Sequence, residues 1–257
     1  MKKFCFTVDD NIRFLKDLTI GCYKSIFEHP YMSVYKRLHQ KYGIKVQLNL
    51  FYETLNDFNL AQMSNKFKSE WLENSAWLKM SFHSKIESAC PYQNATYREV
   101  FSDCEKVQRE IIRFAGKNCL AKTTTVHCCR ATKDGLTALK ANGVKGLLGI
   151  YGTKTAPRNQ YQSTQEHCEI IRNGEIVYQD GIAYANIDIV LNCHQKEEIL
   201  TQLQHLQNRH LIKVMIHEQY FYSDYSLYQK DFEEKLDTTF FALTKNGFES
   251  AFLEDCI

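Results

Sequence analysis

The stretch Phe4-Cys5-Phe6-Thr7-Val8-Asp9-Asp10-Asn11 decides the fold, because an apolar run typical of a buried strand ends at two adjacent acids. Two like charges side by side repel, and burying both is costly unless a positive charge lies beside them. A metal ion would take one carboxylate as a ligand and leave the other free to act as a base. The alternative is a solvated turn, since Asp and Asn favour turns. This segment alone favours the turn, and the rest of the chain has to decide.

Short apolar strands alternate with longer helical patterns about seven times along the chain. Strands are predicted over residues 45–52, 78–83, 123–129, 146–151, 182–191, 211–217 and 248–252. Helices are predicted over residues 33–42, 60–77, 96–116, 133–142, 196–208 and 228–246. The piece from Thr153 to Gly181 breaks this rhythm, and its Asp180-Gly181 pair indicates a hairpin or an elaborated loop. The alternation predicts an α/β fold with a parallel sheet closed, or nearly closed, into a barrel.

Composition limits the classes of partner. The 257 residues contain no dividing linker, so we expect a single domain over residues 1–257. A net charge of +2 gives no strong attraction to nucleic acid or to an anionic membrane, and no apolar run is long enough to span one. Met1-Lys2-Lys3 is not followed by the apolar region of a signal peptide. We therefore expect a cytoplasmic protein whose ten cysteines are reduced.

Polar residues follow the predicted strands at the point where each ends. These residues are Asp9-Asp10, Tyr52-Glu53, His83, His127 and His217. In a parallel barrel the carboxyl ends of the strands meet at one face, and that face carries the chemistry. A structural role is the commoner one for any single histidine, but five strand ends of this kind together favour a site for metal binding or proton transfer.

The third predicted strand ends in His83-Ser84-Lys85-Ile86-Glu87. If a helical turn begins after His83, then His83 and Glu87 share a face, and with Asp10 they would hold one divalent ion. One histidine and two carboxylates suit Zn²⁺, Fe²⁺, Ni²⁺ or Mn²⁺ and leave positions open for water and substrate. The alternative is a helix start in which Ser84 and Glu87 form a capping box, and this competes only for Glu87.

At these residues the chain resembles the NodB-type polysaccharide deacetylases of carbohydrate esterase family four. Thr7-Val8-Asp9-Asp10-Asn11 resembles the family's Thr-Phe-Asp-Asp-Gly, which implies that Asp9 is the general base and Asp10 a metal ligand. His83-Ser84-Lys85-Ile86-Glu87 matches the family's His-Ser/Thr-x-x-His except at its last position. The resemblance implies a distorted (β/α)7 barrel of the glycoside hydrolase/deacetylase type.

Two later segments carry the rest of the resemblance. Val214-Met215-Ile216-His217 is similar to the family strand that ends in a general acid, which implies that role for His217. His127-Cys128-Cys129-Arg130 stands where the family has an arginine followed by proline and glycine. Either Arg130 orients the base as the family arginine does, or His127 replaces part of that function. Tyr52 and His127 at strand ends, with Tyr220 and Tyr222 after His217, are candidate substrate contacts, with core packing as the alternative for the aromatic rings.

The resemblance implies a metal-dependent hydrolase that removes an acyl group from an N-acylated sugar or a related small amide. The metal would be a single divalent ion, zinc first and nickel, iron, manganese or cobalt after it. For a cytoplasmic protein a small soluble substrate or oligosaccharide fits better than a cell-wall polymer. The segment from Thr153 to Gly181 would cover the mouth or make a contact between copies in a homo-oligomer. The competing hypothesis is a barrel that binds a metal or carbohydrate-like ligand without deacetylating it, motivated by Glu87 and the altered arginine motif.

Overall fold

The computed structural model describes residues 1–153 and 155–257, and its strands form two sheets. The first sheet has the order β3 (Leu78–Ser84), β2 (Val46–Phe51), β1 (Lys2–Asn11), β9 (Leu211–His217), β8 (Ile189–Val190), and β10 (Phe248–Ser250) also pairs with β1. The second sheet has the order β4 (Thr123–Thr124), β5 (Gly146–Gly149), β7 (Ile182–Asn186), β6 (Val177–Gln179). Apart from the antiparallel β6–β7 pair, the pairings are parallel, so the carboxyl ends of the strands meet at one face, called the mouth below.

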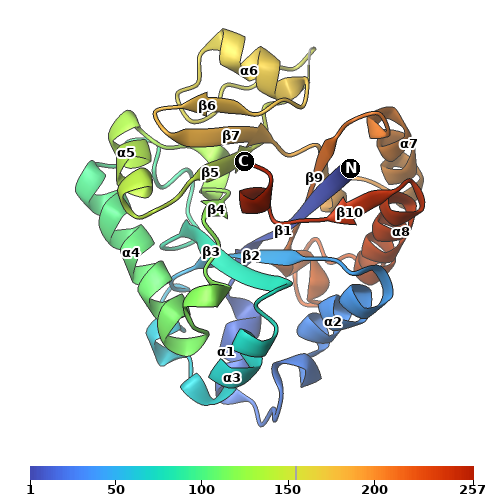
Figure 1. Ribbon diagram of the computed structural model, residues 1–257. Coiled ribbons are helices and arrows are strands. Elements are labelled where there is room, and N and C mark those ends of the chain that lie inside the picture. Colours follow the sequence, from blue (N-terminus) through green and yellow to red (C-terminus); the bar gives the residue numbers. More distant parts are fainter. Residues whose placement is uncertain (154) are drawn as a thin grey trace.

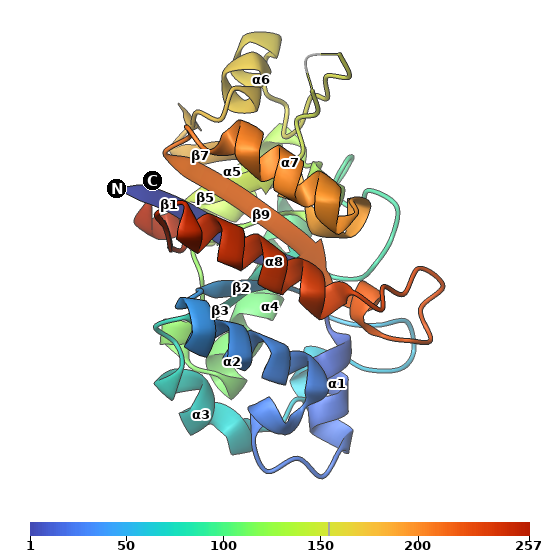
Figure 2. The ribbon, with the colours of Figure 1, turned by 90° about the vertical axis from the view of Figure 1, so that its right-hand side faces the viewer.

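Helices cover the outside of the two sheets, as Figures 1 and 2 show. They are α1 (Arg13–Ile20), α2 (Pro30–Tyr42), α3 (Lys68–Glu73), α4 (Tyr97–Phe114), α5 (Lys133–Ala141), α6 (Gln165–Arg172), α7 (Lys196–Leu206) and α8 (Phe232–Lys245). Helix–strand alternation around a parallel sheet confirms the predicted α/β fold, and the two sheets together form a distorted barrel. No helix among the described residues is both long enough and apolar enough to cross a membrane.

Local sequence signals place several of these elements. Pro30 begins α2, and Gly43, with a φ of 66°, ends it in the left-handed conformation that glycine adopts without strain. Thr96 and Glu99 form a capping box at the start of α4. All six residues of β2 are buried, including Gln47 and Asn49, because both faces of the strand are covered.

Four predicted elements are corrected by the structure, and one of them is the strand predicted over 182–191, which is divided into β7 of the second sheet and β8 of the first. The strand predicted over 123–129 ends at Thr124, because Cys128 and Cys129 have φ values of 60° and 53° and turn the chain into a short 3₁₀ turn over His127–Cys129. The helix predicted over 60–77 is divided into short turns and α3. No helical turn follows His83: residues 85–95 are irregular, and the next helix is α4.

The segment that breaks the rhythm does contain the predicted hairpin. Strands β6 and β7 are joined at Asp180 and Gly181, whose φ values of 52° and 79° suit a tight hairpin turn. The same segment adds α6, which lies with β6 at the edge of the second sheet, at the top of Figure 1. The described parts of this segment therefore enlarge the second sheet.

Candidate active site

A break in β1 allows two consecutive carboxylates to reach the same site. In a regular strand neighbouring side chains point to opposite faces. The pairing of β1 with β2 shifts register between Val8 and Asn11, and Asp10 has a φ of 61°. Asn11 stabilises this bulge, because its side-chain amide donates to the Val8 carbonyl at 2.6 Å and it accepts from the Tyr31 hydroxyl at 2.7 Å. Asp9 and Asp10 are both nearly covered from solvent, so the solvated turn considered from sequence is excluded.

Asp10 lies against two histidines. Its Oδ1 is 3.0 Å from Nε2 of His83 and 3.3 Å from Nδ1 of His127, and these two nitrogens are 3.1 Å apart. Asp10 and His83 end strands of the first sheet, whereas His127 follows β4 in the second sheet. Within the described residues these three form a group whose ligand atoms could hold one metal ion.

The donor set of this group fits a divalent cation. Nδ1 of His83 is hydrogen-bonded to the Thr125 carbonyl, which places a proton on Nδ1 and leaves the Nε2 lone pair directed at Asp10 and His127. A carboxylate oxygen and one nitrogen from each of two imidazoles thus converge on one place, where they could bind a cation. Four ligands about 2.1 Å from a tetrahedral ion lie about 3.4 Å from one another, close to the separations found.

The pKa values of Asp10 and His83 are both shifted by this arrangement. Burial raises the pKa of Asp10, but hydrogen bonds from His127 and His83 outweigh it and hold that pKa well below its usual range. Burial lowers the pKa of His83, yet the charges of Asp9 and Asp10 raise it above the ordinary histidine value. Both shifts follow from the mutual attraction of the carboxylates and the imidazole, which favours a positive charge beside Asp10.

Asp9 stands beside this group in a different environment. Its Oδ1 accepts a hydrogen bond from Nδ2 of Asn49 at 2.6 Å. The Asn49 amide is fixed in that orientation, because its Oδ1 already accepts from Gln47 at 2.8 Å and from Ser81 at 2.6 Å. Burial raises the pKa of Asp9 above its ordinary value, although His83 and His217 nearby lower it. Asp9 is therefore a stronger base than an exposed aspartate.

His217 ends β9 directly beside Asp9, with which it pairs in the sheet. Its Nδ1 lies 2.9 Å from Oδ1 of Asn192, an arrangement that places the proton on Nδ1 and leaves Nε2 for a substrate. The ring of Tyr220 lies beside that of His217, with centroids 6.1 Å apart.

Two residues that follow His217 support the site through hydrogen bonds. Gln219 donates from Nε2 to Oδ2 of Asp10 at 2.7 Å. Glu218 is buried, and its carboxylate accepts from the backbone N–H groups of Ile12 at 2.6 Å, Arg13 at 3.0 Å and Phe14 at 2.7 Å, which caps the first turn of α1. Glu218 therefore joins the end of β9 to the chain that leaves β1.

The remaining residues selected from sequence lie elsewhere. Glu87 is exposed in the irregular loop after β3 and is outside the three-residue group, where His127 stands instead. Arg130 is exposed, and Asn49 rather than Arg130 donates to Asp9. Tyr222 is buried, its hydroxyl donates to Glu218 at 3.0 Å and Arg13 stacks on its ring, so it supports the site rather than facing a ligand. Tyr52 is half-buried, with Lys106 of α4 over its ring.

Sequence reasoning missed Asn49, Asn192, Glu218 and Gln219. A signal for Asn49 was present, since Gln47 and Asn49 alternate with apolar residues in a strand that is buried on both faces. Polar residues in such a strand need internal partners, and that need indicates a buried network. We find no comparable sequence signal for Asn192, which lies far along the chain from His217 in a short 3₁₀ turn.

A cleft of about 450 Å³ reaches Asp10, the member of this group that lines it. Its walls include Asp10, Ile12, Phe51, Leu55 and Ile86, so apolar side chains surround the carboxylate. Glu53 and Glu87 also line it, so Glu87 lies at the same cleft as Asp10 although it is outside the histidine group.

No family model matches this sequence, and no curated protein matches it. Solved structures do match in fold. Bc1960, a peptidoglycan N-acetylglucosamine deacetylase, is 11% identical over 98% of this chain and 86% of its own, with a TM-score of 0.57. BA3943 from Bacillus anthracis, a family 4 pseudoenzyme, is 10% identical over 99% of this chain and 64% of its own, with a TM-score of 0.54. A 4-alpha-glucanotransferase from Thermococcus litoralis is 13% identical over 99% of this chain and 40% of its own, with a TM-score of 0.61. The chain thus has the NodB-like deacetylase fold, and the same fold also carries a transferase and a protein without activity.

Proposed function

We propose that this protein is a metal-dependent hydrolase that removes an acyl group from the nitrogen of an N-acylated sugar or a related small amide. The observation that carries the proposal is the convergence of Asp10, His83 and His127, beside which stand a second buried carboxylate and a third histidine. The deacetylase fold agrees with it, but a fold alone does not fix a reaction.

Asp10, His83 and His127 would hold one divalent ion, zinc first by its preference for such ligands. That ion, when bound, would lower the pKa of a water and polarise the acyl oxygen. Glu87 is left out of this ligand set. Its carboxylate in the cleft wall would instead face the substrate.

Asp9 would take the proton of the attacking water. Its raised pKa suits a base, and the Asn49 amide keeps the carboxylate oriented. His217 would give a proton to the departing amine, and Asn192 holds its ring for that step. The two groups end adjacent strands, so the base and the acid are close enough together to act on one reacting carbon.

The cleft suits an acyl group next to an amide. Ile12, Phe51, Leu55 and Ile86 offer an apolar wall near Asp10. Such a wall excludes water from the reacting atoms and holds a small apolar substituent. Tyr220, beside His217, could offer a ring face to a sugar on the other side.

Metal content tests this proposal and its ligand set. Elemental analysis of protein purified without added metal should give one divalent ion per chain for the wild type, and clear loss for Asp10→Ala and His127→Ala. Glu87→Gln is the matched control and should keep the ion. Retention of metal by His127→Ala together with its loss from Glu87→Gln would reject the ligand set. Absence of metal from all variants, with no hydrolysis of N-acetylated substrates after adding zinc, would favour the competing binding-protein hypothesis.

A further inference from the structure

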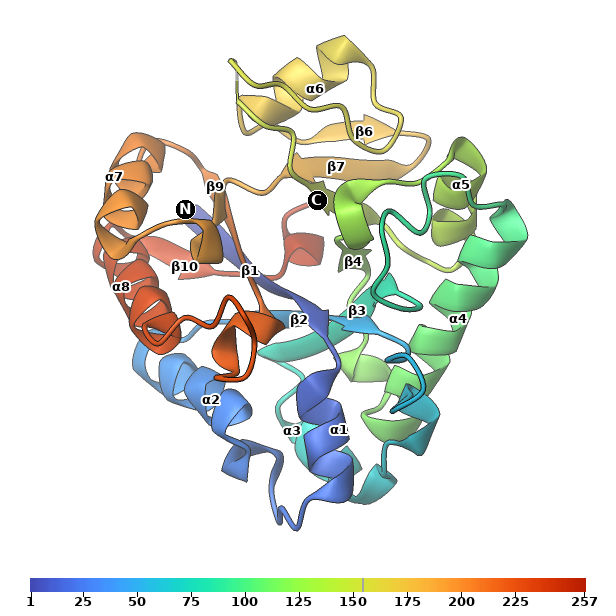
Figure 3. The same cartoon turned by 180° about the vertical axis from the view of Figure 1, so that it is seen from behind.

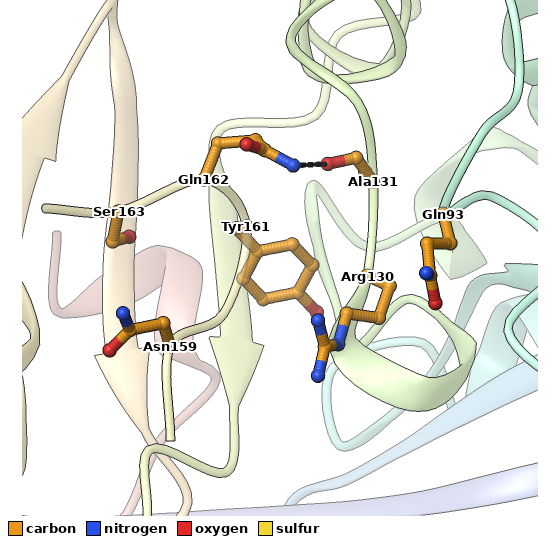
Figure 4. Close-up of a pocket in the computed structure, with 7 residues that line it drawn as sticks. All are labelled: Gln93, Arg130, Ala131, Asn159, Tyr161, Gln162 and Ser163. Atoms are coloured by element: carbon orange, nitrogen blue, oxygen red, sulfur yellow. Dashed lines mark hydrogen bonds between the residues drawn. The ribbon is translucent and has the colours of Figure 1, made fainter. Parts of the chain in front are cut away.

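A second cavity opens beside the candidate active site, between the segments that follow β4 and β5. Its volume is about 210 Å³. It is lined by Gln93, Arg130, Ala131, Asn159, Tyr161, Gln162 and Ser163, which Figure 4 shows around the Tyr161 ring. None of these seven residues is acidic, so Arg130 is the charged group among them.

Arg130 differs from the arginines that serve structural roles in this protein. Arg13 pairs with Asp224, Arg113 with Glu110, and Arg209 with Asp188. Within residues 1–153 and 155–257, Arg130 makes neither an ion pair nor a side-chain hydrogen bond, and it is exposed. Its five N–H donors are therefore available to a ligand.

The other lining groups are suited to hydrogen bonding. Gln93 and Asn159 are exposed, and their side chains have no hydrogen-bond partner in the described chain. Tyr161 and Gln162 have left-handed φ values of 49° and 58°, a strained arrangement that is found preferentially at functional sites. Arg130 and Ala131 also lead directly into α5, so the positive end of that helix dipole lies close to this segment.

This cavity is connected to the candidate active site through the backbone. Arg130 is three residues beyond His127, across the left-handed turn at Cys128 and Cys129. The Tyr161 hydroxyl accepts from the Val126 N–H at 3.1 Å and donates to the Leu148 carbonyl at 2.7 Å. Both segments follow carboxyl ends of parallel strands, so the cavity lies at the same mouth as Asp10.

We propose that this cavity binds an oxyanion, a carboxylate or a phosphate, carried by the substrate. An arginine fork and the neutral amides of Gln93 and Asn159, with no acid among the lining residues, are groups that recognise such an anion. Resting on the proposed function, this narrows the substrate class to a small N-acylated amine or sugar that also bears an acidic group. A neutral polymer would leave Arg130 without a partner.

Three probes that share an N-acetyl sugar test the inference. They are neutral N-acetylglucosamine, N-acetylglucosamine 6-phosphate and N-acetylmuramic acid, titrated calorimetrically into wild type, Arg130→Gln and the control Arg98→Gln, an exposed arginine of α4 outside the cavity. At least one acidic probe should bind the wild type about 10-fold to 100-fold more tightly than the neutral probe, as expected for a charge-assisted bidentate contact. Arg130→Gln should remove that difference, and Arg98→Gln should retain it. The phosphate and the carboxylate probes identify which oxyanion is preferred.

The outcomes separate this inference from the proposed function. Equal affinities for neutral and acidic probes, or an advantage for the acidic probe that survives Arg130→Gln, would overturn the oxyanion site while leaving deacetylation untouched. Tight binding of an acidic probe that depends on Arg130, without release of acetate, would support the site and count against the hydrolase. Inorganic phosphate should compete with the acidic probe for the wild type and Arg98→Gln but not for Arg130→Gln, and a lack of competition in the wild type would also count against the site.

Discussion

The two sheets present their polar side chains at the mouth in opposite ways. At the end of the first sheet Asp9 and His83 are buried and the Asp10 side chain is largely covered, and each makes hydrogen bonds with neighbours. At the end of the second sheet Arg130 and Asn159 are exposed and have no side-chain partner among the described residues. Figure 3, seen from behind, shows the two sheets side by side, with α6 and β6 at the outer edge of the second.

Under the proposed function, this difference separates the groups that would react from the groups that would recognise the substrate. Groups that transfer protons or hold a metal ion need fixed geometry, which burial and supporting hydrogen bonds supply. Groups that recognise a substrate remain solvated until it arrives. His127 belongs by sequence to the second sheet but by contacts to the first, so it joins the two regions. Substitutions in the first sheet should therefore affect all substrates alike, and those at Arg130 only acidic ones.

The largest effect is expected from Asp9→Asn. The change keeps the shape of the side chain but removes the base, so kcat should fall about 10²-fold to 10⁴-fold for neutral and acidic substrates equally. Metal content should stay at the wild-type level. Steady-state kinetics with elemental analysis measures both, and a parallel loss of metal would make Asp9 a ligand instead.

His217→Ala should have a similar but more selective effect. An amide needs a protonated amine to leave, so its hydrolysis should slow by about 10² or more. An activated aryl ester leaves without a proton and should be affected much less. Comparison of N-acetyl and aryl acetate substrates gives the result. Equal losses for the two classes would contradict the acid role.

Glu218, which joins the end of β9 to the start of α1, should make the stability of the protein depend on pH. Burial raises the pKa of Glu218 from 4.5 to about 7, although hydrogen bonds from Ile12, Phe14 and Arg13 lower it. Between these values the folded protein holds a proton that the unfolded chain releases, so this group's contribution to stability falls as pH rises from 4.5 to 7. The full difference is on the order of 3 kcal/mol.

Denaturant unfolding at pH 5 and pH 8 would measure that contribution. The wild type should lose about 2 kcal/mol more free energy of unfolding between the two pH values than Glu218→Gln does. Glu233→Gln, at an exposed glutamate of α8, is the matched control and should follow the wild type. Identical pH slopes for wild type and Glu218→Gln would show that Glu218 does not titrate in this range.

Asn192→Ala should give the smallest effect. It removes the acceptor that orients His217, and supporting contacts of this kind typically contribute about 10-fold. The loss should appear in kcat for amides with KM little changed. Asn192→Asp keeps an acceptor oxygen and should restore most of the rate, whereas a purely structural role would leave both variants equally impaired.

The elements that depend on local or periodic sequence patterns could be predicted from the sequence. The strand that ends in Asp9 and Asp10, the capped helices, the Asp180-Gly181 hairpin and the strand ending in His217 all follow from short-range patterns. The resemblance to the deacetylases, noted on a few residues, agrees with the fold of the solved structures.

The composition of the metal group could not be derived in that way. The four-residue spacing pointed to Glu87, but a spacing argument requires a helix, and none follows His83. His127 lies 44 residues beyond His83, at the start of a left-handed turn at Cys128 and Cys129 that no propensity predicts for cysteine. Arg130 was selected as a partner of Asp9 because of its place in the chain, whereas that same turn leaves it exposed at a separate cavity.

The left-handed backbone at Asp10 has a consequence for laboratory evolution. An aspartate held at a φ of 61° costs of order 1 kcal/mol or more relative to glycine, which adopts that conformation freely. Glycine at position 10 would remove this backbone cost, but it would also remove the carboxylate whose hydrogen bonds with His83, His127 and Gln219 stabilise the ionised form. A library of variants selected for heat resistance alone would therefore show which of these two opposing contributions is larger, and selection that also demands turnover should keep the aspartate.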